Sequence, residues 1–277
     1  MTPLSDPGST KVLNVNSKDL IELAGNPNFI SGIYNYCDRW CERCPFTSRC
    51  LVYASEKEDD EKDPESRDIN NAAFWQRLTS IFEETREMIT AWAEENGVDL
   101  DTPEAQAAKE EHDREMEDAH NHELTLAAED YASQLHDWFE NEFGIETSDD
   151  SGKAAELNAD AEEDKQEASE VLHWYQFQIA AKIVRGLMSR DDDDESEEEE
   201  DNISRDSDGS IKVALIGMDR SISAWRLMQL AAPDKSDSIV PLILALEALR
   251  HNTERAFPQA RDFIRPGFDE VSDTLIQ

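Results

Sequence analysis

The stretch that decides the fold is 167–188, EASEVLHWYQFQIAAKIVRGLM. Its apolar residues, placed at helical spacing, cover nearly every side: Val171, Leu172, Trp174, Phe177, Ile179, Ile183, Val184 and Leu187. A helix that is apolar all round is buried among other helices. The stretch therefore predicts a continuous helix in the middle of a helical bundle.

Four further stretches have helical periodicity, and no sustained alternation typical of strands interrupts them. Gly97 stops one, and the N-cap and first-turn pair Thr102-Pro103 starts another. The four expected helices are 70–96, 102–144, 211–231 and 239–257. The predicted fold is all-α, a bundle of about five main helices.

The organisation outside these helices is inferred from composition. A short helix is expected at 17–25, a second at 28–44 before Pro45, and a turn at Arg265-Pro266-Gly267. Charged, polar stretches predict linkers, the most acidic of them disordered. The expected parts are an arm with a Cys-rich metal-binding lobe (1–55), a charged linker (56–67), a bundle (70–257) interrupted by acidic linkers (147–165 and 190–209), and a tail (258–277).

Charge is distributed unevenly along the chain. The net charge is −38, from 26 basic and 64 acidic residues, and residues 56–201 carry almost all of it. This balance disfavours binding to nucleic acid and to anionic membranes, and it favours a basic protein partner if one exists. Ten lysines against sixteen arginines with so much acid fit either a salt-rich cytosol or a long acidic insert.

No targeting or membrane segment is expected. Residues 1–8, MTPLSDPG, lack a basic region followed by an apolar one, and the longest apolar run, 239–246, is too short to span a bilayer. The expected compartment is the cytoplasm, where thiols stay reduced.

All four cysteines lie within fourteen residues: Cys37, Cys41, Cys44 and Cys50. If 28–44 is helical, the first three share one face, and Pro45 lets the fourth fold back. Clustered thiols in a reducing compartment indicate one metal centre, either a [4Fe–4S] cluster or a zinc ion. Thiols that bind no metal are the remaining alternative. The arginines between the cysteines would offset the negative charge of four thiolates.

Two segments, 34–50 (YNYCDRWCERCPFTSRC) and 257–270 (FPQARDFIRPGFDE), resemble segments of an uncharacterised family of bacterial Cys-rich helical proteins. They cover about a tenth of the chain. That family has no named activity, so the resemblance assigns no role to any residue. The C-x3-C-x2-C spacing also resembles that of radical S-adenosylmethionine enzymes. The fourth cysteine and the lack of strand–helix repeats argue against that match.

A second metal site is a weaker expectation. Carboxylate-bridged di-iron proteins take Glu and E-x-x-H ligands from bundle helices. Two sets share helical faces here: Glu170 with His173, and Glu247, His251 and Glu254. Alternatively, these are solvated faces paired with arginines, and His173 is a core histidine held by a hydrogen bond. Asp219-Arg220 is interpreted in the same way, as an ion pair within the bundle.

Three functions remain open. A cluster would imply electron transfer or redox sensing, and a second metal site would imply a di-iron carboxylate-type oxidoreductase. A non-catalytic interaction protein stapled by structural zinc is the alternative from another class. No phosphate-binding glycine loop or nucleophile elbow is present, so whether the chain is an enzyme is left open.

Overall fold

The computed structural model describes residues 25–62, 70–99, 102–142, 159–195 and 206–269. All regular structure within these ranges is helical, which confirms the all-α prediction. Residues 17–24 of the helix expected at 17–25, and residues 147–158 and 196–205 of the expected linkers, lie outside the described residues. None of the helices in the described ranges is long and apolar enough to cross a membrane.

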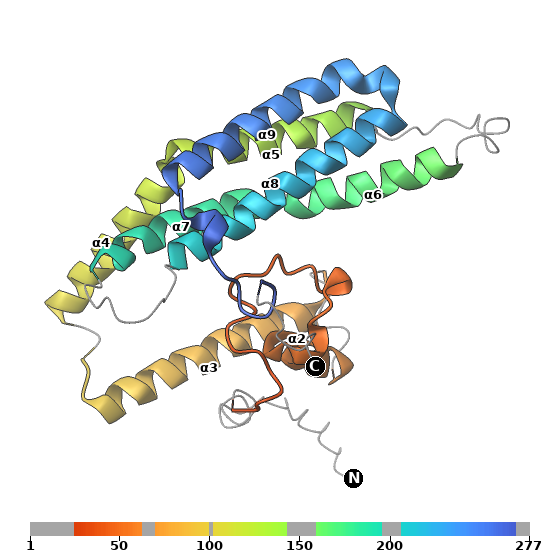
Figure 1. The fold of residues 1–277 in the computed structure, drawn as a ribbon. Coiled ribbons are helices and arrows are strands. Elements are labelled where there is room, and N and C mark those ends of the chain that lie inside the picture. The colour runs from red at the N-terminus through yellow and green to blue at the C-terminus, as the bar shows by residue number, and fades with distance from the viewer. Residues whose placement is uncertain (1–24, 63–69, 100–101, 143–158, 196–205, 270–277) are drawn as a thin grey trace, which may run out of the picture.

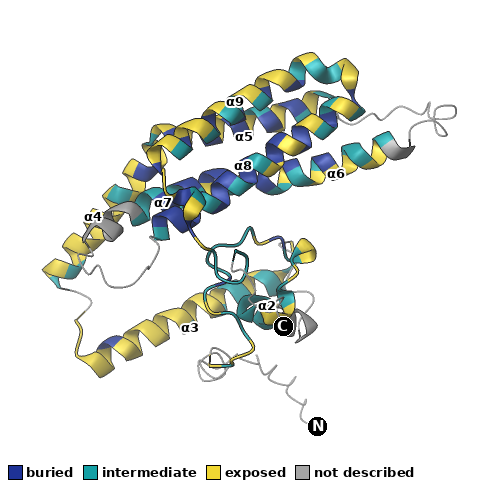
Figure 2. Ribbon diagram, in the orientation of Figure 1, coloured by how far each residue is buried: buried dark blue, intermediate teal, exposed yellow. Residues whose placement is uncertain are grey.

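Five helices form the bundle: α5 (Glu123–Glu142), α6 (Ala159–Tyr175), α7 (Gln178–Glu195), α8 (Asp206–Ala231) and α9 (Ser236–Ala256). The central helix is α8, which packs against α6, α7 and α9, while α5 packs on α7 and α9 (Figure 1). Buried positions are therefore spread more widely around α8 than around the outer helices, which are buried along one stripe (Figure 2).

The expected continuous helix 167–188 is broken, so that part of the prediction was wrong. It forms the end of α6 and the start of α7, separated at Gln176 and Phe177. The buried amide of Gln176 donates to the carbonyl of Ala132 on α5, 2.9 Å away, while Phe177 is 69% exposed. A buried polar side chain needs such a partner, and the break places it there.

The expected helix 102–144 is also two helices, α4 (Pro103–Asn121) and α5. Its start is confirmed, because the Thr102 hydroxyl accepts from the amide of Ala105. The chain is extended at His122, whose Nδ1 accepts from the amide of Leu124 at 3.1 Å and so starts α5. A histidine thus interrupts a pattern that is continuous in sequence.

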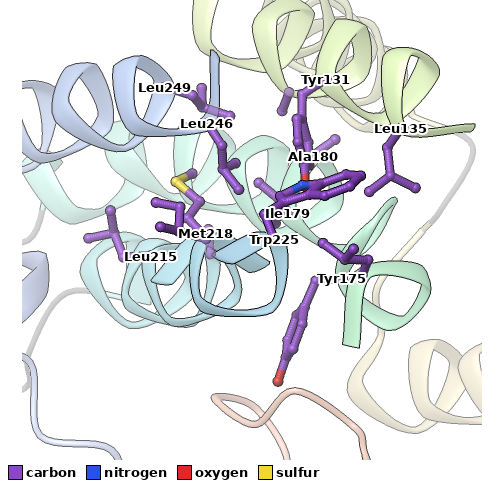
Figure 3. Packing of buried hydrophobic residues seen from close by; sticks show 14 of the residues in the cluster. Tyr131, Leu135, Tyr175, Ile179, Ala180, Leu215, Met218, Trp225, Leu246 and Leu249 are labelled. Carbon is purple, nitrogen blue, oxygen red and sulfur yellow. The ribbon is translucent and has the colours of Figure 1, made fainter. Parts of the chain in front are cut away.

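The bundle core is built around Trp225 of α8 (Figure 3). Its indole N–H donates to the hydroxyl of Tyr131 at 2.9 Å, and its ring packs edge-on against Trp138. Burial raises the pKa of Tyr131 above its ordinary value, so that hydroxyl stays neutral. Tyr175 points from this core toward the N-terminal part of the chain (Figure 3).

The helices extend into the stretches expected to be linkers. α7 continues to Glu195, α8 begins at Asp206, and α2 (Leu51–Lys62) occupies half of the charged stretch 56–67. The first residues of α8 are buried rather than solvated. Two aspartates in its first turn suit the positive end of the helix dipole, so acidic composition was a poor guide to the boundary.

Helix α3 (Ala72–Asn96) ends as predicted. Its N-cap is Asn71, which accepts from the amide of Ala73, and Gly97 closes it with a φ of 66°. Only Gly and a few polar residues adopt this left-handed conformation readily. In Figure 1, α3 runs apart from the five-helix bundle.

Candidate metal centre

The cysteines lie in a turn-rich loop, residues 26–50, here called the cysteine loop. The helix expected at 28–44 was wrong: the loop has successive turns and two short 3-10 helices, Cys41–Arg43 and Thr47–Arg49. Gly32 has a φ of 71° and Arg39 a φ of 57°, and a right-handed helix cannot continue through either. The loop begins with a turn at Asn26-Pro27, where the amide of Asn28 donates to the side chain of Asn26.

The four cysteine side chains nevertheless line one small space of about 20 Å³. Most of the remaining wall is apolar and aromatic, from Ile33, Tyr34, Trp40, Tyr53 and Phe268. The space is of the size that holds one water molecule or one ion. In the described part of the chain, no three or more Cys, His, Asp or Glu side chains are grouped closely enough to hold a metal ion as they stand. Binding would therefore require the cysteine side chains to rotate inward.

Backbone hydrogen bonds already engage two of the sulfurs. The amide of Phe46 donates to Cys44 Sγ at 3.4 Å, and Cys37 Sγ lies 3.5 Å from the carbonyl of Tyr34. Pro45 has no N–H, so Phe46 supplies the first amide after Cys44 that can reach back. N–H groups directed at sulfur stabilise thiolate and are a feature of metal–thiolate sites.

The thiols of Cys37 and Cys41 are held in the protonated form. Burial raises the pKa of Cys37, and the nearby charges of Arg39 and Lys182 only partly offset it. Burial also raises the pKa of Cys41, with a contribution from Glu56. Both thiols are neutral near pH 7, so a metal binding here would have to displace protons.

Asp38 fastens the cysteine loop to the bundle. Its carbonyl accepts from Trp174 Nε1 at 2.9 Å and from Gln178 at 2.5 Å, and its carboxylate accepts from the hydroxyl of Tyr175 at 2.6 Å and from Arg220. Three helices, α6, α7 and α8, thus meet at this one residue. Burial, followed by the hydrogen bond to the carboxylate, raises the pKa of Tyr175 above its ordinary value.

Trp40 supplies a second attachment. Its ring stacks on Trp174 with centroids 4.9 Å apart and an interplanar angle of 14°. The guanidinium of Arg43 lies over the Trp40 ring, 4.2 Å from its centroid, and forms a 2.7 Å ion pair with Glu170 of α6. Trp40 therefore joins the wall of the thiol space to the surface of α6.

The loop is also tied to the start of α8. The hydroxyl of Tyr36 donates to Asp206 at 2.7 Å, and Asp206 accepts as well from Arg185 and Ser189. Burial alone would raise the pKa of Asp206, but these donors outweigh it and hold that pKa below its ordinary value. A methyl group at Gly209 would lie 2.5 Å from the ring of Tyr36, so the close contact requires glycine there.

The C-terminal segment closes the remaining side. The expected turn at 265–267 is present, with Gly267 at a φ of 74°, and it packs against the loop. Phe268 meets Phe46 at 5.1 Å, and Asp269 is bound by Arg265 and by Lys212 of α8. The segments 34–50 and 257–269 are therefore neighbours in the fold.

The residues of the weaker second site are not assembled. Glu170 and His173 are exposed on α6: Glu170 pairs with Arg43, and His173 Nδ1 lies 2.8 Å from the carbonyl of Ser169. The expectation that this helix leaves His173 buried was wrong, because α6 has a solvent face.

The other three residues lie on α9. Glu247 pairs with Arg226, Glu254 pairs with Arg261, and His251 is exposed. Since α6 and α9 each pack on α8, the two sets lie on separate helices without the mutual packing that a shared site would need. The alternative interpretation, solvated faces paired with arginines, accounts for the carboxylates.

Asp219 and Arg220 form ion pairs, as expected, but with different partners. Asp219 pairs with Arg250 at 3.0 Å and with Arg261 at 2.6 Å, whereas Arg220 pairs with Asp38. Sequence reasoning did not identify Asp38 as the residue that docks the loop. No local signal could have identified it, because its partners lie 136 to 182 positions later in the chain.

A larger groove of about 610 Å³ lies beside the thiol space. The cysteine loop, α6 and α8 line it, and it shares Asp38, Trp40, Cys44 and Phe268 with the thiol space. Its surface combines apolar side chains of α6 and α8 with paired arginines and carboxylates. A metal centre would therefore have solvent access on the side of Cys44.

Comparison of the chain with protein-family models, with curated proteins and with solved structures finds no match.

Proposed function

We propose that Cys37, Cys41, Cys44 and Cys50 together bind one metal centre, either a [4Fe–4S] cluster or a zinc ion, in a reducing cytoplasm. The observation that carries the proposal is that all the cysteines of the chain line one small space. Four thiolates are a complete ligand set for either centre.

The surroundings suit a negatively charged centre. Four thiolates with Zn²⁺, or with an oxidised cubane, have a net charge near −2. Arg39 and Lys182 lie close enough to Cys37 to favour its thiolate, and Arg43 lies beside Trp40 in the same wall. Cations thus gather around the thiols in a chain whose overall charge is strongly negative.

A cluster and a zinc ion imply different functions. With a cluster, the groove beside Cys44 would admit a redox partner or small oxidant, and the protein would transfer electrons or sense redox state. With zinc, the centre would fasten the cysteine loop, and the protein would act through its surfaces. The attachment through Asp38 supports the zinc alternative, because it shows a loop built for docking.

Metal and acid-labile sulfide analysis with a visible spectrum, on protein purified without oxygen, tests the proposal. Iron, sulfide and a broad absorption band near ~400 nm identify the cluster, whereas colourless protein with one zinc ion per chain identifies a structural zinc site. Cys44→Ala should lose most of the metal, and Ser48→Ala, an exposed position in the same loop, should keep it. Unchanged metal content in Cys44→Ala would refute the four-thiolate site.

A further inference from the structure

Helix α3 presents an apolar stripe to solvent. Six large side chains along it are at least 46% exposed: Trp75, Ile81, Phe82, Met88, Ile89 and Trp92. Most of α3 is coloured as exposed in Figure 2. Only Ala93 of the helix is buried, and no other described element packs extensively against α3. Exposed apolar surface of this extent on one helix marks an interaction site. An isolated helix of this composition also gains too little from its own hydrogen bonds to be stable in water.

The spacing within the stripe fits a helix as the occupant. Positions 75, 78, 82, 85, 89 and 92 alternate steps of three and four, and five of these six are apolar. This is the seam of a pair of packed helices, and it runs almost the full length of α3. Its occupant must therefore be a helix of similar length with a matching stripe. The bundle helices bury their stripes against one another, so they do not supply it.

Charge along α3 favours a second copy running antiparallel. The first half, up to Phe82, has Arg77 as its only charged residue, whereas 83–96 has five glutamates and one arginine. A parallel pair would place the two acidic halves side by side. An antiparallel pair places each acidic half against the weakly basic half of its partner, and a two-fold axis relates the copies. We propose that α3 pairs with α3 of a second copy of this chain in this antiparallel arrangement.

The salt dependence of association distinguishes this self-pairing from binding to a basic protein. Two copies of the chain, each with a net charge of −38, repel each other. Salt screens this repulsion, because the Debye length falls from about 10 Å at 0.1 M to about 3 Å at 1 M salt. Self-association through an apolar stripe should therefore strengthen with salt. Association with a basic partner would weaken instead.

Sedimentation of the full chain, under reducing conditions at 0.1 M and 1 M NaCl, tests the proposal. We expect a monomer–dimer equilibrium that shifts toward dimer at high salt. Phe82→Asp should raise the dissociation constant more than about a hundredfold, because both copies lose a buried ring. Gln76→Asp adds the same charge on the opposite face and should change it less than about threefold.

A second variant tests whether misfolding, and not loss of the contact, weakens the dimer in Phe82→Asp. Thr85 is the one polar residue among the seam positions 75 to 92, and Thr85→Leu should lower the dissociation constant about tenfold. A variant that fails to fold would not bind more tightly. A wild-type chain that stays monomeric at both salt concentrations would overturn the proposal. A dimer insensitive to both Phe82→Asp and Thr85→Leu would do the same, because another face would then hold it.

Discussion

Removing the hydroxyl of Tyr175 should loosen the cysteine loop from the bundle. In Tyr175→Phe the ring remains in the core, and only the 2.6 Å hydrogen bond to the Asp38 carboxylate and the contact with Arg220 are lost. Hydrogen bonds to charged groups contribute about 1.5–3 kcal/mol. Arg220 still binds Asp38 in the variant, and the Asp38 side chain is 19% exposed. We therefore expect the free energy of unfolding to fall by an amount near the lower end of this range, about 1–2 kcal/mol.

Urea unfolding of the apo protein, followed by far-UV circular dichroism, measures this loss. Tyr53→Phe is the matched control. It also removes a hydroxyl from the wall of the thiol space, but this hydroxyl has no described hydrogen bond. A double-mutant cycle with Asp38→Asn should give a coupling energy of about 1 kcal/mol between the two side chains. A Tyr175→Phe variant as stable as the control would refute the role of Asp38 as the docking residue.

Two other perturbations test the contacts at the start of α8. Gly209→Ala should destabilise the fold by about 1–2 kcal/mol in urea, since its methyl group overpacks the ring of Tyr36. Higher stability, as helix propensity alone predicts, would contradict the close contact. Asp206 has a lowered pKa in the fold, so its stabilising contribution is complete well above pH 3.8 and is lost as the pH falls below that ordinary value. Asp206→Asn should flatten this acid-side decline of the unfolding free energy, and an unchanged slope would show that the carboxylate is not held as described.

Local signals predicted helix boundaries correctly where a residue acts on its own neighbours. Gly97 stops α3 and Thr102 caps α4 through contacts within the same few residues. The breaks at His122 and Gln176 were missed because apolar periodicity continues across both. The partner that explains the second break, the Ala132 carbonyl, lies 44 positions away in the chain.

For the candidate sites too, local spacing was informative in one case and insufficient in the other. Cysteine spacing was enough to group Cys37, Cys41, Cys44 and Cys50 around one space, although the helix used to justify that grouping does not form. For the second site, helical spacing alone was not a sufficient guide. Ligands that share one face of a helix complete a metal site only if a neighbouring helix places further ligands opposite them. Arginines from other elements occupy that place, and no local pattern could show it.

The order of synthesis has a consequence for when the centre can be filled. Asp38 docks against Trp174 and Arg220, which lie 136 and 182 positions later in the chain. At about 5–20 residues per second, the ribosome adds those 182 positions in roughly 10–35 s. The thiols are therefore exposed to solvent, oxidants and free metal ions throughout most of translation. Their permanent surroundings form only after the last helices leave the ribosome.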